Sequence, residues 1–200
     1  MAKSSMDAAI ARGQGRSMDG SALHALTYEF MMPPSVALVL DIQTDNPRRT
    51  LHEVNDIVKR HEGTQSTTNY LFSRLGRVVF AKSGKATLDD IMDDAIDAGA
   101  EDLEETDDGS LVVWTQPKQT NEVVKAVGAK FNLNVSSADI LWSPNEDTMA
   151  PVGDSLELQK LVKVVSALKG RIDVQSVYSN AARGEAAEED WEDLEKNLDV

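Results

Sequence analysis

Residues 36–63 constrain the fold more than any other stretch, because they predict a strand, a tight turn and a helix in direct succession. Residues 36–42 form an almost continuous apolar run rich in β-branched side chains, which is typical of a buried strand. Asn46 followed by Pro47 marks a helix start, since the first is a favoured N-cap and the second suits the first helical position. Apolar residues at helical spacing follow, and Gly63 marks the helix end.

Hydrophobic periodicity predicts the remaining elements. Further strands are expected at residues 25–31, 69–72, 77–80, 103–106, 110–115, 135–142 and 172–178, and further helices at residues 87–98, 120–131 and 158–168. Ser73 to Gly76 separates two of these strands and predicts a hairpin turn there. The elements between residues 77 and 142 follow the order β-α-β-β-α-β, which is the ferredoxin-like order.

The last helix and strand lack a sheet of their own, so we expect them to return to the strands of residues 25–73. The fold class is therefore α+β, with two ferredoxin-like α/β sandwich domains, the second inserted into the first. The predicted divisions are residues 1–20 (a short helix and linker), 21–82 with 151–181 (the first domain), 83–150 (the inserted domain) and 182–200 (an acidic tail expected to be disordered).

The charge is strongly negative and unevenly distributed. The net charge is −14, yet residues 45–85 hold eight Lys and Arg against four Asp and Glu. Residues 86–110 hold eleven acidic residues and no Lys or Arg. A local basic patch can still bind a polyanion, although the net charge weakens or opposes long-range steering.

Few residues suggest catalysis or metal binding. The absence of cysteine excludes disulfides and thiolate metal sites, and fits a reducing compartment. No apolar run is long enough for a transmembrane helix. Asp89, Asp93 and Asp97 form an acidic helical stripe, for which a solvated face is favoured over a divalent-cation site. No nucleophile elbow, catalytic carboxylate pair or Walker motif occurs, so we expect no enzyme, no cofactor and no metal site.

The turn at residues 44–50 is the strongest candidate site. It presents Arg48, Arg49 and the amides of a helix N-terminus, an arrangement suited to an anion. On the residues alone, two interpretations remain: a capped helix with two exposed arginines, or a grip on a phosphate of RNA.

Seven short motifs, in order along roughly residues 1–181, resemble one protein family. They are Ile10-Ala-Arg-Gly13, Tyr28-Glu29, Thr44-Asp45-Asn46 with Arg49-Thr50 and Glu53-Val54, Tyr70-Leu-Phe72, Ala98-Gly-Ala-Glu-Asp102, Asp107-Asp-Gly109 and Asp173-Val-Gln-x-Val-Tyr-x-Asn180. The chain resembles the YebC/PmpR family, whose mitochondrial members include the translational activator of cytochrome c oxidase subunit I. Against that family, residues 1–20 retain only a remnant of an N-terminal helical domain.

The resemblance implies a non-enzymatic factor that binds RNA or the ribosome and activates translation. Its location would be the mitochondrial matrix in a eukaryote and the cytoplasm otherwise. No membrane partner is expected, and of the oligomeric states, which the sequence leaves open, a monomer is favoured. A DNA-binding transcriptional regulator is the alternative, and a small-molecule-sensing ferredoxin-like module is a second. The candidate nucleic-acid-binding residues are Arg12, Asn46, Arg48, Arg49, Lys59, Arg60, Arg74 and Arg77. Asn46 and Arg49 match the family signature by position, whereas Arg48 departs from it.

Overall fold

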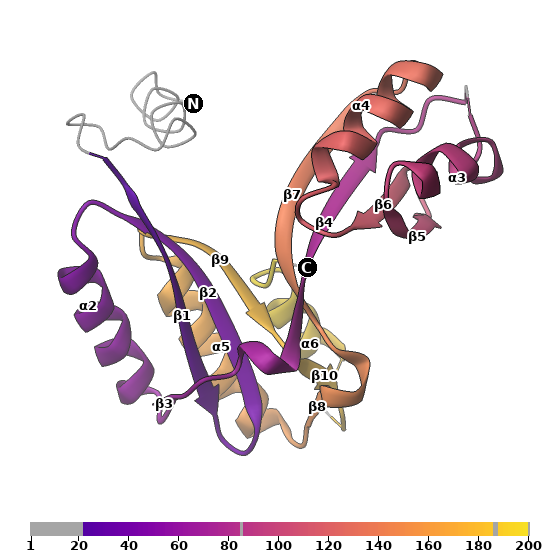
Figure 1. Ribbon diagram of the computed structural model, residues 1–200. Helices are drawn as coiled ribbons and strands as arrows, with labels where there is room; N and C mark the ends of the chain where they lie inside the picture. Colours follow the sequence, from indigo (N-terminus) through magenta and orange to yellow (C-terminus); the bar gives the residue numbers. More distant parts are fainter. Residues whose placement is uncertain (1–21, 85, 186–187, 200) are drawn as a thin grey trace, which may run out of the picture. The chain divides into compact units, whose positions relative to one another are not determined.

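The computed structural model describes residues 22–84, 86–185 and 188–199 (Figure 1). It is a mixed α+β chain that divides into two compact units. Unit 1 comprises the chain up to Phe72 and from Pro144 onward, and unit 2 is Ser73–Ser143. The predicted fold class, α+β with two α/β domains, is confirmed. The predicted N-terminal helix and linker, with Arg12, lie outside the described residues.

Unit 1 is built on a four-stranded antiparallel sheet. Its strands are β1 (His24–Met32), β2 (Val36–Thr44), β3 (Thr64–Gln65) and β9 (Val174–Ser179), in the order β3-β1-β2-β9. Helices α2 (Pro47–Arg60), α5 (Ser155–Lys169) and α6 (Glu188–Glu195) share one apolar core with it. Two short parallel strands, β8 (Ala150–Val152) and β10 (Ala181–Arg183), and two 3-10 turns, η1 (Asn69–Leu71) and η2 (Glu146–Thr148), complete the unit.

The central position of β2 in the sheet explains why its sequence is apolar almost throughout. Leu38 and Leu40 enter the core shared with the helices, and Ala37 and Val39, on the opposite face, are also fully buried. Strand β9 pairs with β2 through Leu40 and Val177, so the final strand returns to the first sheet as predicted. The chain order is β-β-α-β and then α-β, so unit 1 does not repeat the ferredoxin-like order.

Unit 2 has the ferredoxin-like order that the sequence predicts. Its elements are β4 (Phe72–Phe80), α3 (Leu88–Asp97), β5 (Ala100–Glu105), β6 (Leu111–Thr115), α4 (Thr120–Phe131) and β7 (Val135–Pro144). The strand order is β5-β6-β4-β7, and the separate core of this unit joins β4 and β6 to both helices. Val78, Val113 and Val123 are fully buried there.

The hairpin predicted at residues 73–76 is wrong, because β4 is one continuous strand. Gly76 lies within it, where an added Cβ would stand 2.0 Å from the Thr120 hydroxyl oxygen and 2.5 Å from that of Thr115. The glycine therefore permits a close approach of α4 to the sheet and does not make a turn. Because β4 is a central strand of the second sheet, the inserted unit begins at Ser73, not at residue 83, and ends at Ser143, not at 150.

The acidic tail expected to be disordered contains helix α6, so that prediction is also corrected. Leu194 is fully buried in the core of unit 1, and Trp191 and Leu198 pack against the same core. Beyond the helix, Asp199 donates its amide to the carbonyl of Val177 at 2.9 Å and accepts the Val177 amide at 2.8 Å. A small apolar face and these two bonds to β9 hold a segment that is otherwise mostly acidic in sequence. In the described ranges, no helix is long and apolar enough to cross a membrane.

Candidate nucleic-acid interface

The turn that precedes α2 satisfies most of its own backbone amides. The side chain of Asn46 caps the helix by accepting the amide of Arg49 at 3.1 Å, and its carbonyl accepts the amide of Thr50 at 3.1 Å. The amide of Asn46 donates to the Thr44 hydroxyl at 3.0 Å, and Pro47 has no amide proton. The helix N-terminus therefore offers an anion few free donors, and any anion binding here depends on side chains.

A buried chain of hydroxyl groups fastens this turn to the start of β9. The hydroxyls of Thr44 and Thr50 lie 2.7 Å apart, and Thr50 donates to the carboxylate of Asp173 at 3.0 Å. Both threonines are fully buried, and Asp173 is nearly so. The carbonyl of Asp173 also accepts the amide of Gln43 at 2.8 Å. These residues carry much of the family signature, and the structure gives them a role in holding the fold.

The two arginines of the turn differ in their surroundings. Arg49 forms an ion pair with Asp45, at 2.8 Å, across one helical turn. Arg48 is exposed and takes part in none of the ion pairs found in the described part of the chain. At the other end of α2, Lys59 is exposed, and Arg60 is exposed with its Nε donating to the carbonyl of Asp56 at 3.2 Å.

Helical spacing places Arg48, His52 and Lys59 on one face of α2, within about 40° of one another around the axis. We call these three residues the α2 stripe. The two permanent charges, eleven residues apart, are separated by about 16 Å along the helix. All three side chains are exposed because the opposite face of α2, including Val54 and Val58, is buried in the core. His52 adds charge to the stripe only when it is protonated, and it lies 3.5 Å from an Asp56 carboxylate oxygen.

Arg49 and Arg60 lie on a neighbouring face that also carries acidic residues. Glu53 and Asp56 occupy the positions between them, so the charge of that face is balanced. Glu53 is itself paired with Arg171. Of the five predicted residues on or next to α2, Arg48 and Lys59 are thus the two best placed to contact phosphate.

Arg74 and Arg77 belong to unit 2 and pack against tryptophan rings. Arg77 faces Trp114 in the register of β4 and β6, with its guanidinium carbon 6.0 Å from the ring centre, and it is half-buried. Arg74 is exposed and lies 5.1 Å from the ring centre of Trp142. Both contacts are cation–π interactions within unit 2, so these arginines do not extend the α2 stripe within its own unit.

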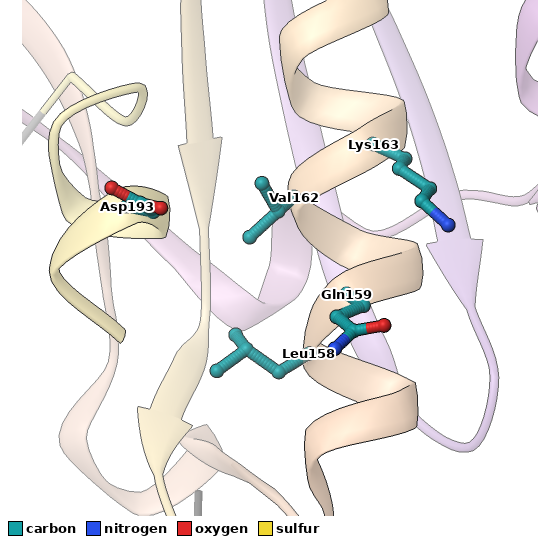
Figure 2. Close-up of a pocket in the computed structure, with 5 residues that line it drawn as sticks. All are labelled: Leu158, Gln159, Val162, Lys163 and Asp193. Carbon is teal, nitrogen blue, oxygen red and sulfur yellow. The ribbon is translucent and has the colours of Figure 1, made fainter. Parts of the chain in front are cut away.

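The surface of the described part of the chain has several depressions. One, of about 150 Å³, lies beside Lys82 and Leu111 in unit 2. Another, of about 160 Å³, lies beside α5 and α6; Figure 2 shows Leu158 and Val162 pointing towards the side of Asp193, whereas Gln159 and Lys163 point the other way. A third, of about 560 Å³, is an open hollow on the sheet of unit 2 beside Trp114. No group of three His, Asp or Glu side chains suited to a metal ion occurs among the described residues.

Tyr70 is a candidate that the sequence analysis missed. Its side chain is 67% exposed in the 3-10 turn η1, although a strand was predicted there. The available signal was its place in the Tyr70-Leu-Phe72 motif, where Phe72 is buried and the tyrosine is not.

Comparison with known proteins gives one family. Residues 23–181 match the family model described as TACO1/YebC second and third domain. A probable transcriptional regulatory protein of Hahella chejuensis is 38% identical over 90% of this chain and 71% of its own length. One from Ralstonia nicotianae is 34% identical over 92% and 75%, respectively.

A solved structure agrees with the sequence matches. The crystal structure of the conserved hypothetical protein Aq1575 from Aquifex aeolicus aligns with a TM-score of 0.66 and 28% identity. The alignment covers 84% of this chain and 69% of that one. With its α+β architecture in two units and a family match spanning both of them, the chain belongs to the TACO1/YebC family.

Proposed function

We propose that this chain is a non-enzymatic gene-expression factor that binds RNA, free or within the ribosome, and supports translation. It would act in the mitochondrial matrix of a eukaryote or in the cytoplasm otherwise. The observation that carries the proposal is the α2 stripe, which leaves two unpaired cations exposed on one helix face of a chain with net charge −14.

The chemistry of the stripe favours contacts with a phosphate backbone. Arg48 and Lys59 are long, flexible cations, and the residues between them on the same face, His52 and Asn55, carry no carboxylate. Contacts to phosphate position a protein on a nucleic acid but carry no sequence information. Such a surface can bind RNA without selecting its sequence, so the choice of RNA would depend on other contacts.

A DNA-binding transcriptional regulator is the second candidate, because the relatives named above are called probable transcriptional regulatory proteins. Reading duplex DNA requires side chains that reach base edges in a groove. Asn55, which lies on the same face as the stripe, has its side-chain oxygen occupied by the Tyr28 hydroxyl at 3.1 Å. We therefore place RNA first.

Titration of a labelled single-stranded RNA and a labelled DNA duplex at several salt concentrations tests the proposal. We expect the RNA to bind more tightly, with the affinity falling as salt rises. Arg48→Ala with Lys59→Ala should weaken RNA binding and flatten the log–log salt dependence by roughly 0.7 for each lost phosphate contact.

A control matched in charge is Lys163→Ala with Lys196→Ala, since both lysines are exposed and lie in unit 1. Unlike the cations of the stripe, Lys196 is paired, with Glu192 and Asp193. Equal loss in the two double variants would show that only net charge matters. Tighter binding of the duplex would favour the transcriptional candidate, and no binding to either nucleic acid would refute the proposal.

A further inference from the structure

The sheet of unit 2 has one face that packs against its helices and one face that does not. Val78 on β4 and Val113 on β6 are paired, and both are fully buried in the core with α3 and α4. Because successive residues of a strand point to opposite faces of a sheet, Val79, Val112 and Trp114 lie on the other face. The hollow of about 560 Å³ beside Trp114 lies on this second face.

The floor of this hollow is apolar. Val79 and Val112 lie opposite each other on β4 and β6, and Val112 is buried. The half-buried Trp114 follows on the same face of β6, and its ring centre lies 6.0 Å from the guanidinium carbon of Arg77. The floor therefore offers apolar area beside an aromatic ring that already accommodates one guanidinium group.

The rim of the hollow is acidic. Its carboxylates come from Glu104 on β5 and from Asp107 and Asp108 in the turn between β5 and β6. The lining includes one cation, Arg77, and Lys82 lies close enough to Asp108 to offset part of its charge. The lining thus carries three carboxylates against one guanidinium, so the hollow favours a cationic ligand.

Two of the three carboxylates are held in place by neighbouring groups. Glu104 accepts the indole N–H of Trp114 at 2.9 Å. Asp108 accepts the Thr106 hydroxyl at 2.5 Å, and the amide and the hydroxyl of Ser110 at 3.0 and 3.2 Å. A cation that enters the hollow therefore meets carboxylates that are already ordered, and its binding immobilises few side chains of this chain.

Exposed acidic residues on an edge strand have an ordinary explanation, since charge at a sheet edge prevents pairing with other chains. That explanation suits Glu101 and Glu105, which are exposed on the edge strand β5. It does not suit Asp107, which lies beyond the end of the strand and lines the hollow. The Asp107 carboxylate forms no hydrogen bond or ion pair within the described part of the chain. Its charge is therefore available to a partner.

We infer that the hollow beside Trp114 binds a basic segment of a partner protein, with an arginine side chain lying over Val79, Val112 and Trp114 and its guanidinium among the three carboxylates. Arginine combines an apolar stem with a planar charged end, so one side chain matches both the floor and the rim. Guanidinium groups also bind to the faces of tryptophan rings. RNA does not suit this surface, because the carboxylates repel a phosphate backbone. The inference goes beyond the proposed function and does not depend on it.

Titration of the full chain with the peptide acetyl-Gly-Arg-Gly-Arg-Gly-amide tests this inference. The same peptide with citrulline in place of arginine is the control ligand, because citrulline keeps the shape of the side chain and removes its charge. In ¹⁵N-labelled protein, the three tryptophans give three indole N–H signals, which substitution by phenylalanine assigns. We expect the arginine peptide to shift the signal of Trp114, whose N–H is bonded to Glu104, and to leave that of Trp191 unchanged. The citrulline peptide should shift neither signal.

Glu104→Gln with Asp107→Asn removes two of the carboxylates, while the glutamine oxygen can still accept the Trp114 N–H. We expect this double variant to bind the arginine peptide roughly 2- to 30-fold more weakly, the effect of losing two exposed ion pairs. Asp89→Asn with Asp93→Asn is the matched control, since both residues are exposed on α3, which packs against the opposite face of the sheet. It changes the net charge equally and should bind the peptide as the wild type does.

Each result decides for or against the inference. Equal loss in the two double variants would show that only net charge matters and would overturn it. An arginine peptide that binds without shifting the Trp114 signal, or that does not bind at low salt, would overturn it as well. If labelled single-stranded RNA shifts that signal and the peptide does not, this face binds nucleic acid, and the inference fails while the proposed function stands. Failure of RNA binding through the α2 stripe would refute the proposed function and leave this inference untouched.

Discussion

Replacing Thr50 by valine would test whether the signature turn is held by its buried hydroxyl chain. The Thr50 hydroxyl donates to the Asp173 carboxylate and lies 2.7 Å from the Thr44 hydroxyl. The Thr44 hydroxyl in turn accepts the amide of Asn46 and lies 3.5 Å from a carboxylate oxygen of Asp45. Valine has nearly the same shape as threonine but can neither donate nor accept, so it breaks the chain at its centre.

The magnitude follows from the two lost bonds. A hydrogen bond to a charged group contributes about 1.5–3 kcal/mol and a neutral one about 0.5–1.5 kcal/mol. Because Thr44 and Thr50 are fully buried, water does not replace them freely. We expect Thr50→Val to lower the free energy of unfolding of unit 1 by about 2–4 kcal/mol, or its melting temperature by roughly 4–16 °C for a chain of this size.

A probe specific to unit 1 is needed because two units need not unfold in one step. The chain has three tryptophans, and only Trp191 lies in unit 1. In a background with Trp114→Phe and Trp142→Phe, urea denaturation followed by tryptophan fluorescence therefore reports on this unit.

Thr27→Val is the matched control. The Thr27 hydroxyl also faces a carboxylate, that of Asp41 at 3.4 Å, but the pair is exposed. We expect a change below about 0.5 kcal/mol for this variant. The same small change for Thr50→Val would refute the reasoning and leave the buried chain without a stabilising role.

Two further predictions concern the other parts of the fold. Leu194→Ala should destabilise unit 1 by about 2–5 kcal/mol in the same urea assay, because Leu194 is fully buried; an unchanged midpoint would mean that α6 contributes nothing. In unit 2, hydrogen bonds from the Thr106 hydroxyl and from the amide and hydroxyl of Ser110 lower the pKa of Asp108. The stability that this lowered pKa gives unit 2 is present above the ordinary aspartate pKa of about 4 and is lost as pH falls through the lowered value. Asp108→Asn should therefore reduce the acid destabilisation seen in melting curves of unit 2 followed through Trp114, whereas identical acid limbs would contradict the prediction.

The sequence was sufficient to predict those elements whose pattern lies within one segment of the chain. Helix α3 shows this: Ile91 and Ala95 recur at helical spacing and are buried, and Thr87 forms the capping box with Asp90. The glycine at position 76 shows the opposite case. In the sequence, a glycine that makes a turn cannot be told from a glycine that lets another element pack closely against a strand. Here the closely packed residue is Thr120, which is distant in sequence.

The contacts of the candidate site also differ in whether local sequence is enough to predict them. The ion pair of Arg49 with Asp45 spans four residues of one helix start, so sequence spacing alone indicates it. The contact of Arg77 with Trp114 depends on the register of β4 against β6, which a single segment does not specify. Composition also misled at α6, because one buried leucine and two partly buried apolar residues hold a segment that is otherwise strongly acidic.

The motifs through which this chain resembles its family mostly make internal bonds. Glu29 anchors η1, Asn46 caps α2, and Asp173 fastens the turn to β9. Asn180, which is nearly fully buried, accepts the amide of Ala37 at 2.8 Å and donates to a carbonyl of η2 at 2.6 Å. Because the polar groups of these residues already form hydrogen bonds within the chain, few of them remain to bind a partner. These motifs therefore account for a shared fold more directly than for a shared ligand. Function must then depend on exposed residues that this framework positions, and this is the physical reason to test Arg48, which departs from the signature, and Asp107, a motif residue whose carboxylate forms no hydrogen bond or ion pair within the described part of the chain.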